Sequence, residues 1–203
     1  MACYQCVAVS MDARCEKAAS DGHLECLRHF RENGCPWDNL TTEYSAAHGH
    51  LNCLRYAIEE GCPRNVTAVN RATANGYFDC VRYLIEQECP CDRLTMFYAA
   101  RASQLHCMKY LRAHGCQWDS WVSSRATINR DLECLQFLVE HGCPWDEVGI
   151  SALLEVVKTT TAPDELESYM TLLCKLAFDK VQGHEKILEM PEYNAYISCV
   201  WLK

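Results

Sequence analysis

The sequence predicts an all-α protein, a solenoid of stacked helix–turn–helix repeats closed by a C-terminal capping helix. Three observations support this: two cysteine ladders with a constant step, columns of apolar and aromatic residues in the same register, and Asp and Gly residues that punctuate each unit. The ladders advance by 27 residues per step and consist of Cys26, Cys53, Cys80, Cys107 and Cys134, and of Cys35, Cys62, Cys89, Cys116 and Cys143. Five members in each of two columns exclude chance as the cause of this period.

Each unit is expected to begin with a helix of about nine residues. Its N-cap is an Asp or Asn, whose side-chain oxygen accepts a hydrogen bond from a free backbone N–H group. This column is Asp38, Asn65, Asp92, Asp119 and Asp146. Small residues on the first helices allow neighbouring units to approach closely, and these are Ser45, Ala72, Ala99 and Ala126. Gly22 or Gly49 then supplies the positive φ that a tight turn requires. A first helix at about residues 12–20 precedes the series, and a sixth starts near Asp146.

A second helix is expected in each unit, for example over residues 51–60. Leu51, Leu54 and Ile58 lie at i, i+3 and i+7 and so share one face of it. Gly61 ends this helix in a left-handed conformation, and Pro63 prevents its continuation. Neither helix of a unit can bury its apolar face alone, so neighbouring units must stack into one continuous core.

The repeat register is lost after Val157, which divides the chain into an array over residues 1–157 and a cap with a tail over residues 158–203. Residues 158–163 are predicted to form a loop, with Pro163 at the start of a helix that continues over 164–178. The apolar face of this helix is Leu166, Tyr169, Leu172, Leu173 and Leu176. It is predicted to cap the array. The apolar tail over 193–203 either packs on this cap or docks to another chain.

The segments AASDGHL at 18–24 and AAHGHL at 46–51, the latter followed by Leu54 and Gly61, resemble the ankyrin repeat. Ankyrin units usually have 33 residues, including a β-hairpin finger between helix pairs. Here the linker GCPWD at 34–38 leads straight into the next helix, so we expect an ankyrin-like solenoid that lacks these fingers. The resemblance covers about residues 12–157 and implies a protein-binding module.

Composition limits the classes of partner. The formal net charge is −8, which gives no general attraction to nucleic acid or to an anionic membrane surface. No apolar run reaches the ~20 residues of a membrane-spanning helix, and the N-terminus does not read as a secretory signal. We therefore expect a protein of a reducing compartment, cytoplasmic or nuclear, and monomeric on its own. The sequence contains no catalytic or phosphate-binding motif, so we expect a protein that is not an enzyme and that binds no cofactor.

The 16 cysteines raise the question of metal binding or disulfides. A zinc site would use Cys3-x-x-Cys6 with Cys15, or Cys89-x-Cys91, but needs a second such pair or histidines at ligand spacing. A disulfide needs Cα atoms within about 7 Å, whereas stacked helices lie about 10 Å apart. The ladder cysteines are therefore predicted to be buried small hydrophobic residues, and no metal is assigned. Metal binding at Cys3, Cys6 and Cys15 stays open, because this group lies outside the ladders.

Two further columns are predicted to be structural. His23 and His50 follow the turn glycine and are expected to stabilise the turn through hydrogen bonds. The tryptophans of the linkers are expected to pack between units, and they are Trp37, Trp118 and Trp145.

The candidate binding surface lies on the first helices. The residue before the small pair of each unit is cationic or aromatic, in the order Lys17, Tyr44, Arg71, Tyr98 and Arg125. We call this series the first-helix ridge. Its flanking residues are His48, Asn75, Arg101 and Asn129. The resemblance to ankyrin repeats places it on the concave face. Arg and Tyr are favoured in protein interfaces, so we hypothesise binding to an acidic or phosphorylated segment of another protein. The alternative is a variable solvated face.

The resulting functional prediction is a protein–protein interaction module, acting as an adaptor, scaffold or inhibitor. Substrate recruitment in a ubiquitin ligase is one form of it. One alternative is a structural subunit of a large assembly that docks through the apolar tail. Another is a cysteine-based zinc or redox protein, which reactive thiols or bound zinc would favour.

Overall fold

The computed structural model describes residues 14–179, 184–191 and 193–194. These residues contain α-helices and no strand, which confirms the all-α class without β-hairpin fingers. The chain divides into two compact units, one formed by residues 1–102 and 106–116 and the other by residues 103–105 and 117–203. We call them unit 1 and unit 2. The predictions for Cys3, Cys6 and the tail beyond residue 194 lie outside the described residues.

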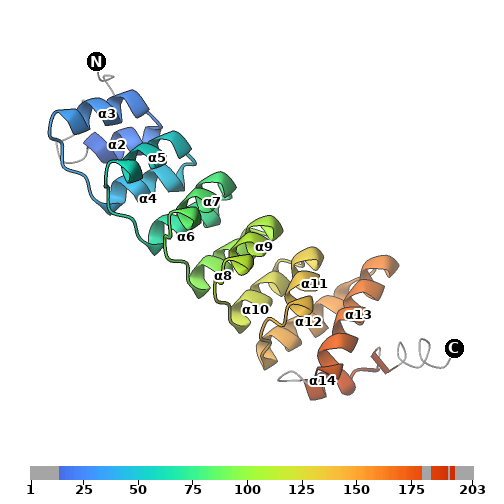
Figure 1. Ribbon diagram of the computed structural model, residues 1–203. Helices are drawn as coiled ribbons and strands as arrows, with labels where there is room; N and C mark the ends of the chain where they lie inside the picture. Colours follow the sequence, from blue (N-terminus) through green and yellow to red (C-terminus); the bar gives the residue numbers. More distant parts are fainter. Residues whose placement is uncertain (1–13, 180–183, 192, 195–203) are drawn as a thin grey trace. The chain divides into compact units, whose positions relative to one another are not determined.

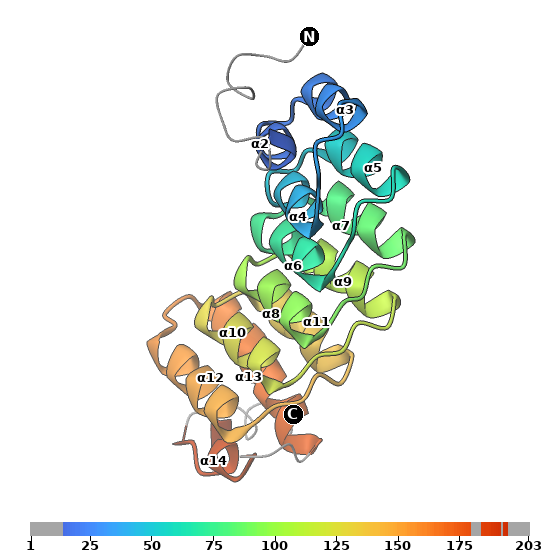
Figure 2. The ribbon, with the colours of Figure 1, turned by 90° about the vertical axis from the view of Figure 1, so that its left-hand side faces the viewer.

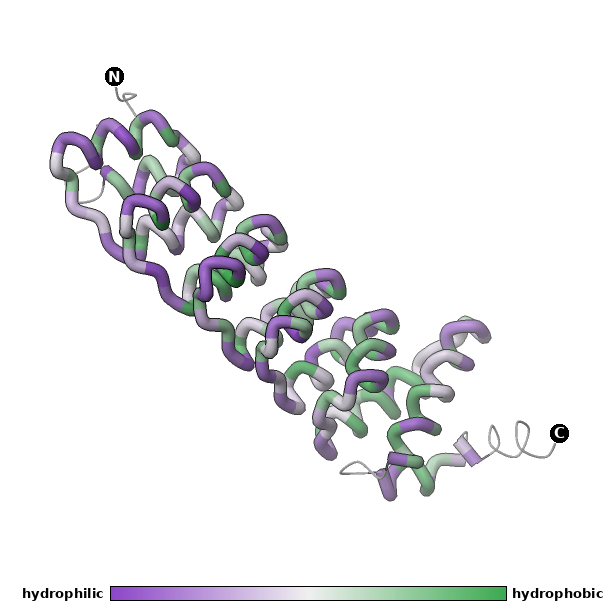
Figure 3. The backbone as a smooth tube through the Cα atoms, in the orientation of Figure 1, coloured by the Kyte–Doolittle hydropathy of each residue, from purple (hydrophilic) through white to green (hydrophobic). Residues whose placement is uncertain are grey.

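Unit 1 consists of helix pairs in two rows (Figures 1 and 2). The first helices are α2 (Arg14–Asp21), α4 (Asn39–Ala47), α6 (Val66–Asn75) and α8 (Arg93–Arg101), and the second helices are α3 (Leu24–Glu32), α5 (Leu51–Glu59), α7 (Phe78–Glu86) and α9 (Leu105–Ala113). Helices α2, α4 and α6 each pack against the second helix that follows and against the next first helix. Hydrophobic and hydrophilic segments alternate along these helices (Figure 3), as amphipathic helices that share a core require.

The first helices begin at the predicted caps. The carboxylate of Asp38 accepts from the backbone N–H of Leu40 at 2.8 Å, and the side-chain oxygen of Asn65 accepts from that of Ala68 at 3.2 Å. Asp92 forms a capping box, because the Thr95 hydroxyl also accepts from the Asp92 N–H. These bonds satisfy N–H groups that have no partner within the helix.

The second cysteine ladder lies at the C-terminal ends of the second helices. Backbone bonds from Gly61 to Ile58 (3.1 Å) and from Cys62 to Ala57 (2.8 Å) form a Schellman motif, which turns the cysteine inward. The Cys62 thiol then donates to the carbonyl oxygen of Asp38, one linker earlier, at 3.1 Å. Cys89 and Cys116 make the same bond to Asn65 and Asp92, each at 3.2 Å. The ladder thus connects successive linkers, which the sequence did not predict.

The first ladder lies inside the second helices. Cys53, Cys80 and Cys107 are at most 2% exposed. Desolvation raises the pKa of Cys80 to about 12 and the pKa of Cys53 and Cys107 to about 11. These thiols are therefore protonated at neutral pH, which confirms the prediction of buried small hydrophobic residues.

The glycine after each second helix has a positive φ, for example +77° at Gly61. In one repeat this position holds Glu88, with φ of 57°. An L-residue with a side chain is strained in this left-handed region by about 1–2 kcal/mol. Two other positive-φ positions without glycine are Ser103 and Arg130.

Replacing Glu88 by Gly is expected to stabilise unit 1. The change removes the left-handed strain, while the greater freedom of Gly in the unfolded chain offsets part of it, leaving a gain of about 0.5–1 kcal/mol. The measurement is the urea midpoint followed by circular dichroism. The control is Arg82→Gly in the exposed middle of α7, which should lower the midpoint. A midpoint lowered by both changes would show that Glu88 makes a stabilising contact that outweighs its strain.

Unit 2 contains α10 (Ser120–Ile128), α11 (Leu132–Glu140), α12 (Glu147–Thr159), α13 (Pro163–Phe178) and α14 (His184–Leu188). Helix α12 begins after the predicted cap Asp146, and α13 begins at Pro163 as predicted. Helix α12 ends at Thr159, so the loop predicted over 158–163 shrinks to three residues.

Helix α13 completes the stack of unit 2. It packs on α11 and α12, as a second helix would, while α12 packs on α10. Leu173 and Tyr169 of its predicted apolar face are buried, and the Tyr169 hydroxyl donates to the carbonyl oxygen of Arg130 at 3.1 Å. Helix α13 therefore caps the array by taking the place of a second helix, and α14 covers the end of the α12–α13 pair through contacts with both helices.

Candidate protein-binding surface

The first-helix ridge of unit 1 runs over α2, α4, α6 and α8. Its members are exposed or half-buried, namely Lys17, Tyr44, Arg71 and Tyr98. The structure brings Arg71 and Tyr44 together from neighbouring repeats, with the guanidinium carbon 5.8 Å from the centroid of the tyrosine ring. A cation over an aromatic face is attractive, so these two side chains form one continuous surface.

A buried carboxylate lies beneath this surface. Glu43 has a side chain that is only 5% exposed, and its Oε2 lies 3.3 Å from Nε of Arg71. Its Oε1 accepts from the side-chain amides of Asn39 at 2.7 Å and Asn65 at 2.9 Å. A carboxylate at this depth requires such partners, since an unpaired buried charge is costly. Arg71 is consequently an ion-pair partner between repeats as well as a surface residue.

The cation at the start of the ridge is also paired. Nζ of Lys17 lies 2.8 Å from the carboxylate of Asp21 on the same helix. An acidic ligand would have to compete with Asp21 and Glu43 for the two ridge cations of unit 1. This pairing reduces the positive charge that this part of the ridge offers.

The flanking residues form bonds between and within repeats. The Asn75 amide donates to the carbonyl oxygen of Ala47 at 2.9 Å, and Nδ1 of His48 lies 3.0 Å from the carbonyl oxygen of Tyr44. In unit 2 the Asn129 amide donates to the hydroxyl of Ser103 at 3.3 Å. Arg101 is exposed. These bonds fix the edges of the surface.

The turn histidine has the predicted role. Nε2 of His50 lies 3.0 Å from the carbonyl oxygen of Ser20 in the preceding turn. Its imidazole also lies so close to Gly22 that an added Cβ there would be 2.5 Å from Nδ1. Two features therefore require glycine at position 22: its positive φ of +73° and the close approach of the His50 ring.

The ridge residue of unit 2, Arg125, lies beside large exposed apolar side chains. Trp121 is 64% exposed and Ile128 is 63% exposed, and both share a face of α10 with Arg125 at i, i+4 and i+7. Val148, 70% exposed, is the residue of α12 in register with Trp121. We call these four residues the α10–α12 face. Nε of Arg125 is buried without a hydrogen-bond partner among the residues that the structure describes.

The prediction from sequence missed Trp121, Ile128 and Val148. A signal was present, because the second residue of each first helix forms its own column: Leu40, Thr67, Leu94, Trp121 and Val148. Val122 and Ala126 of α10 are fully buried. Since these two residues fill the core, helical geometry places Trp121 on the opposite, solvent side.

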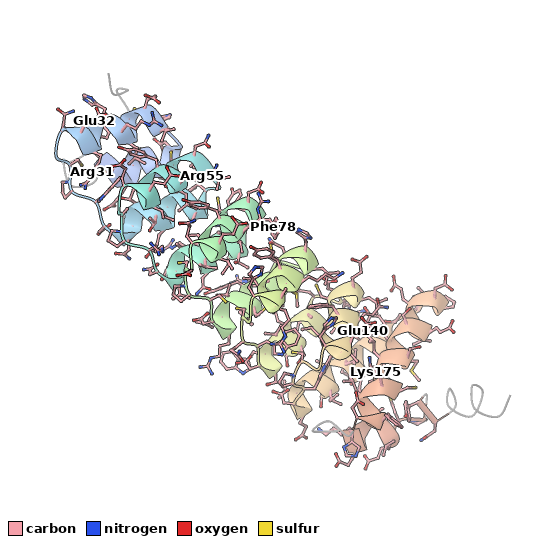
Figure 4. The ribbon with its side chains drawn as sticks, viewed as in Figure 1. Arg31, Glu32, Arg55, Phe78, Glu140 and Lys175 are labelled. Carbon is pink, nitrogen blue, oxygen red and sulfur yellow. The ribbon has the colours of Figure 1, made fainter. Side chains whose placement is uncertain are left out.

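On the second helices, a cation and several aromatic rings make contacts between neighbouring repeats. Arg55 and Phe78 both lie on second helices (Figure 4). The guanidinium carbon of Arg55 lies 5.3 Å from the ring centroid of Tyr83, one repeat further on, and the Phe78 ring makes an edge contact with the His106 ring. Two of the linker tryptophans, Trp37 and Trp118, pack against an aromatic ring of the next repeat, as predicted. The ring centroid of Trp37 is 6.0 Å from that of Tyr56 in the next repeat.

The described residues contain no group of three or more His, Cys, Asp or Glu side chains that could hold a metal ion. A cavity of about 460 Å³ in unit 2 is lined by the ends of α12 and α13, with Val157, Leu166 and Met170 among its walls. Its mostly aliphatic lining suits apolar contact rather than acid–base chemistry. No helix among the described residues is long and apolar enough to cross a membrane.

Helix pairs repeated every 27 residues, with exposed interface-type side chains on the first helices, define a repeat protein of the helix–turn–helix class. The family model "Ankyrin repeats (3 copies)" matches residues 16–95 and residues 43–120, which together make up just over half of the chain. The chain belongs to the ankyrin repeat family. Proteins of this family typically serve as non-enzymatic modules for protein–protein interaction.

Solved structures agree on the fold. The crystal structure of the human ASB11 ankyrin repeat domain matches with a TM-score of 0.64 at 16% sequence identity. The match covers 78% of this chain and 82% of that domain. No curated protein matches the sequence.

Proposed function

We propose that this protein is a non-enzymatic binding module that acts as an adaptor, scaffold or inhibitor and holds another protein on its first helices. In unit 2 the partner contacts the α10–α12 face, and in unit 1 it contacts the first-helix ridge. The array over residues 1–157 supplies these surfaces, while residues 158–203 form the cap and tail. The setting is a reducing compartment, cytoplasmic or nuclear, and the chain is monomeric before it binds.

The observation that carries this proposal is the exposure of Trp121 and Ile128 beside Arg125. Trp and Arg are the residue types most enriched among interface hot spots, and a cluster of exposed apolar side chains marks an interaction site more often than a solvated surface. A partner that covers Trp121 would remove a large apolar area from water. The same partner could offer a carboxylate or phosphate to Arg125, in line with an acidic or phosphorylated segment.

A second candidate function, a structural subunit of a larger assembly, is favoured by a different observation. Phe178 is 86% exposed and Leu188 is 49% exposed at the capping end of unit 2. With Tyr193 they line a hollow of about 540 Å³. A neighbouring subunit that covers this hollow would dock through the cap and leave the first helices free.

Affinity purification from the native cell extract, read by mass spectrometry, distinguishes the two. The baits are the wild type, a variant with Tyr44, Arg71, Tyr98 and Arg125 changed to Ala, and the double variant Trp121→Ala/Ile128→Ala. The control is Arg55→Ala/Arg82→Ala on the second helices. All variants are first checked by circular dichroism. Losing one hot-spot residue costs at least about 2 kcal/mol, so we expect recovery of the partner to fall by tenfold or more with both first-helix variants and to be unchanged with the control.

A further bait carries Phe178→Ala at the capping end. A partner retained by both first-helix variants and lost from this bait would contradict binding through the first helices. That result would favour the structural-subunit function.

A further inference from the structure

Cys91 occupies a position that holds a different residue in every other linker. The corresponding residues are Trp37, Arg64, Trp118 and Trp145. Cys91 is half-buried, in contrast to the ladder cysteines of unit 1, which are at most 5% exposed. Cys91 is therefore partly open to solvent.

The second ladder brings another thiol to it. The Cys116 sulfur donates to the carbonyl oxygen of Asp92 at 3.2 Å, and Asp92 directly follows Cys91. The side chains of Cys91 and Cys116 also lie within hydrogen-bonding reach of each other, so the single Cys116 proton can go either to the Asp92 carbonyl oxygen or to the Cys91 sulfur. In an earlier repeat the equivalent thiol, Cys62, reaches the carbonyl oxygen beside Trp37. A cysteine at the Trp position thus places two sulfur atoms side by side across one repeat of unit 1.

The two thiols differ in acidity. The hydrogen bond from Cys116 lowers the pKa of Cys91 below its ordinary value, more than its partial burial raises it. The same hydrogen bond, together with desolvation, raises the pKa of Cys116. A partly exposed cysteine with a lowered pKa is of the reactive kind, and a second thiol in contact with it can resolve its oxidation.

We infer that Cys91 and Cys116 are a peroxide-sensitive thiol pair, at which hydrogen peroxide produces an intramolecular disulfide. The Cys91 thiolate attacks one oxygen of the peroxide, the O–O bond breaks, and the departing hydroxide takes up a proton to become water. This gives a sulfenic acid on Cys91. The Cys116 sulfur then attacks the Cys91 sulfur, the S–S bond forms, and the S–O bond breaks. The hydroxyl leaves with the Cys116 proton as a second water.

The disulfide would enclose α8 and α9, because Cys91 precedes α8 and Cys116 follows α9. A cross-link around a loop of this length restricts the unfolded chain, so the oxidised form gains resistance to unfolding. Helix α8 carries Tyr98 of the first-helix ridge. Oxidation therefore stiffens the repeat that bears this residue, whether or not the ridge binds a partner.

The test uses the full-length purified protein, first fully reduced. It is treated with hydrogen peroxide at a small molar excess, the remaining thiols are blocked with N-ethylmaleimide, and a non-reducing digest is read by mass spectrometry. We expect a peptide pair joined through Cys91 and Cys116 to form before any other oxidised species, to disappear with dithiothreitol, and to raise the midpoint of thermal unfolding.

Two variants and one internal control sharpen the result. Cys91→Trp installs the residue of three other linkers, where a ring would face Tyr110 as Trp37 faces Tyr56, so it should fold and form no cross-link. Cys116→Ser should leave a Cys91 sulfenic acid that dimedone traps. The Cys15 and Cys35 thiols also hydrogen-bond to each other but are at most 2% exposed, and they should stay reduced. A Cys91 that remains fully alkylatable, or that links to another cysteine or another chain, overturns the inference.

Discussion

Unit 1 is expected to lose stability from about pH 9 upward and to unfold near pH 10.5, because its buried thiols resist ionisation. Burial raises the pKa of Cys15, Cys62 and Cys80 to about 12 and that of Cys53, Cys89 and Cys107 to about 11, from an ordinary value of 9.0. The folded state therefore holds protons that the unfolded state releases. Stability from these groups is complete below the ordinary pKa and is lost as the pH rises toward the folded values.

The expected loss is large. Each thiol destabilises the fold by about 2 kcal/mol near pH 10.5, so six together cost about 12 kcal/mol, which is comparable to the total stability of a typical domain. Cys91 has the opposite effect on stability at high pH, because its pKa is lowered in the folded state, but it is a single group. The measurement is the free energy of unfolding by urea, in reducing buffer, between pH 8 and 11.

The matched variant is Cys53→Ala/Cys80→Ala, which removes two fully buried thiols. It should be less stable at pH 8, yet its stability should fall less steeply with pH, by up to about 1.4 kcal/mol per pH unit for each thiol removed. A wild type whose stability is the same at pH 8 and pH 10.5, or a variant with an unchanged slope, would show that the ladder thiols are not buried as described.

Gly22→Ala is expected to destabilise unit 1 by about 3 kcal/mol. The new Cβ would take a φ of +73°, which costs about 1–2 kcal/mol, and would lie 2.5 Å from the His50 imidazole. Displacing that ring also breaks its bond to the Ser20 carbonyl oxygen, worth about 1 kcal/mol. Gly34→Ala is the control, because Gly34 has a φ of +78° and nothing within 4 Å of an added Cβ.

A double-mutant cycle isolates the contact. In a His50→Ala background, Gly22→Ala should cost no more than Gly34→Ala does in the wild type, since the colliding ring is gone. Equal costs for Gly22→Ala in both backgrounds would show that the left-handed conformation alone explains the glycine. Stability is measured by urea unfolding.

Most of the fold could be predicted because the same helix-start and helix-end signals recur in each repeat. Asp38 and its counterparts mark where a first helix begins, and Gly61 with Pro63 marks where a second helix ends, and the structure confirms both. The length of α12 could not be predicted in the same way. This helix ends outside the register, and its last turn over Lys158 and Thr159 has no counterpart to compare with.

The candidate site was predicted less well, since it depends on contacts between repeats. The ridge column was identified, but nothing in the spacing shows that Arg71 pairs with Glu43 or that Asn75 bonds to Ala47. The Cys91–Cys116 pair was missed for a related reason. Spacing along one ladder excludes bonding within that ladder, but says nothing about a thiol outside it that meets a ladder thiol one repeat away.

Binding through the first helices is tested most directly by hydrogen–deuterium exchange of the protein alone and in complex with the partner recovered by affinity purification. If the partner binds the first helices, protection should concentrate in α10 and the start of α12, with Trp121, Arg125, Ile128 and Val148, and in the ridge helices of unit 1, while α5 and α7 exchange as before. Protection confined to α13 and α14, with α10 and α12 unchanged, would contradict binding through the first helices and assign the partner to the cap.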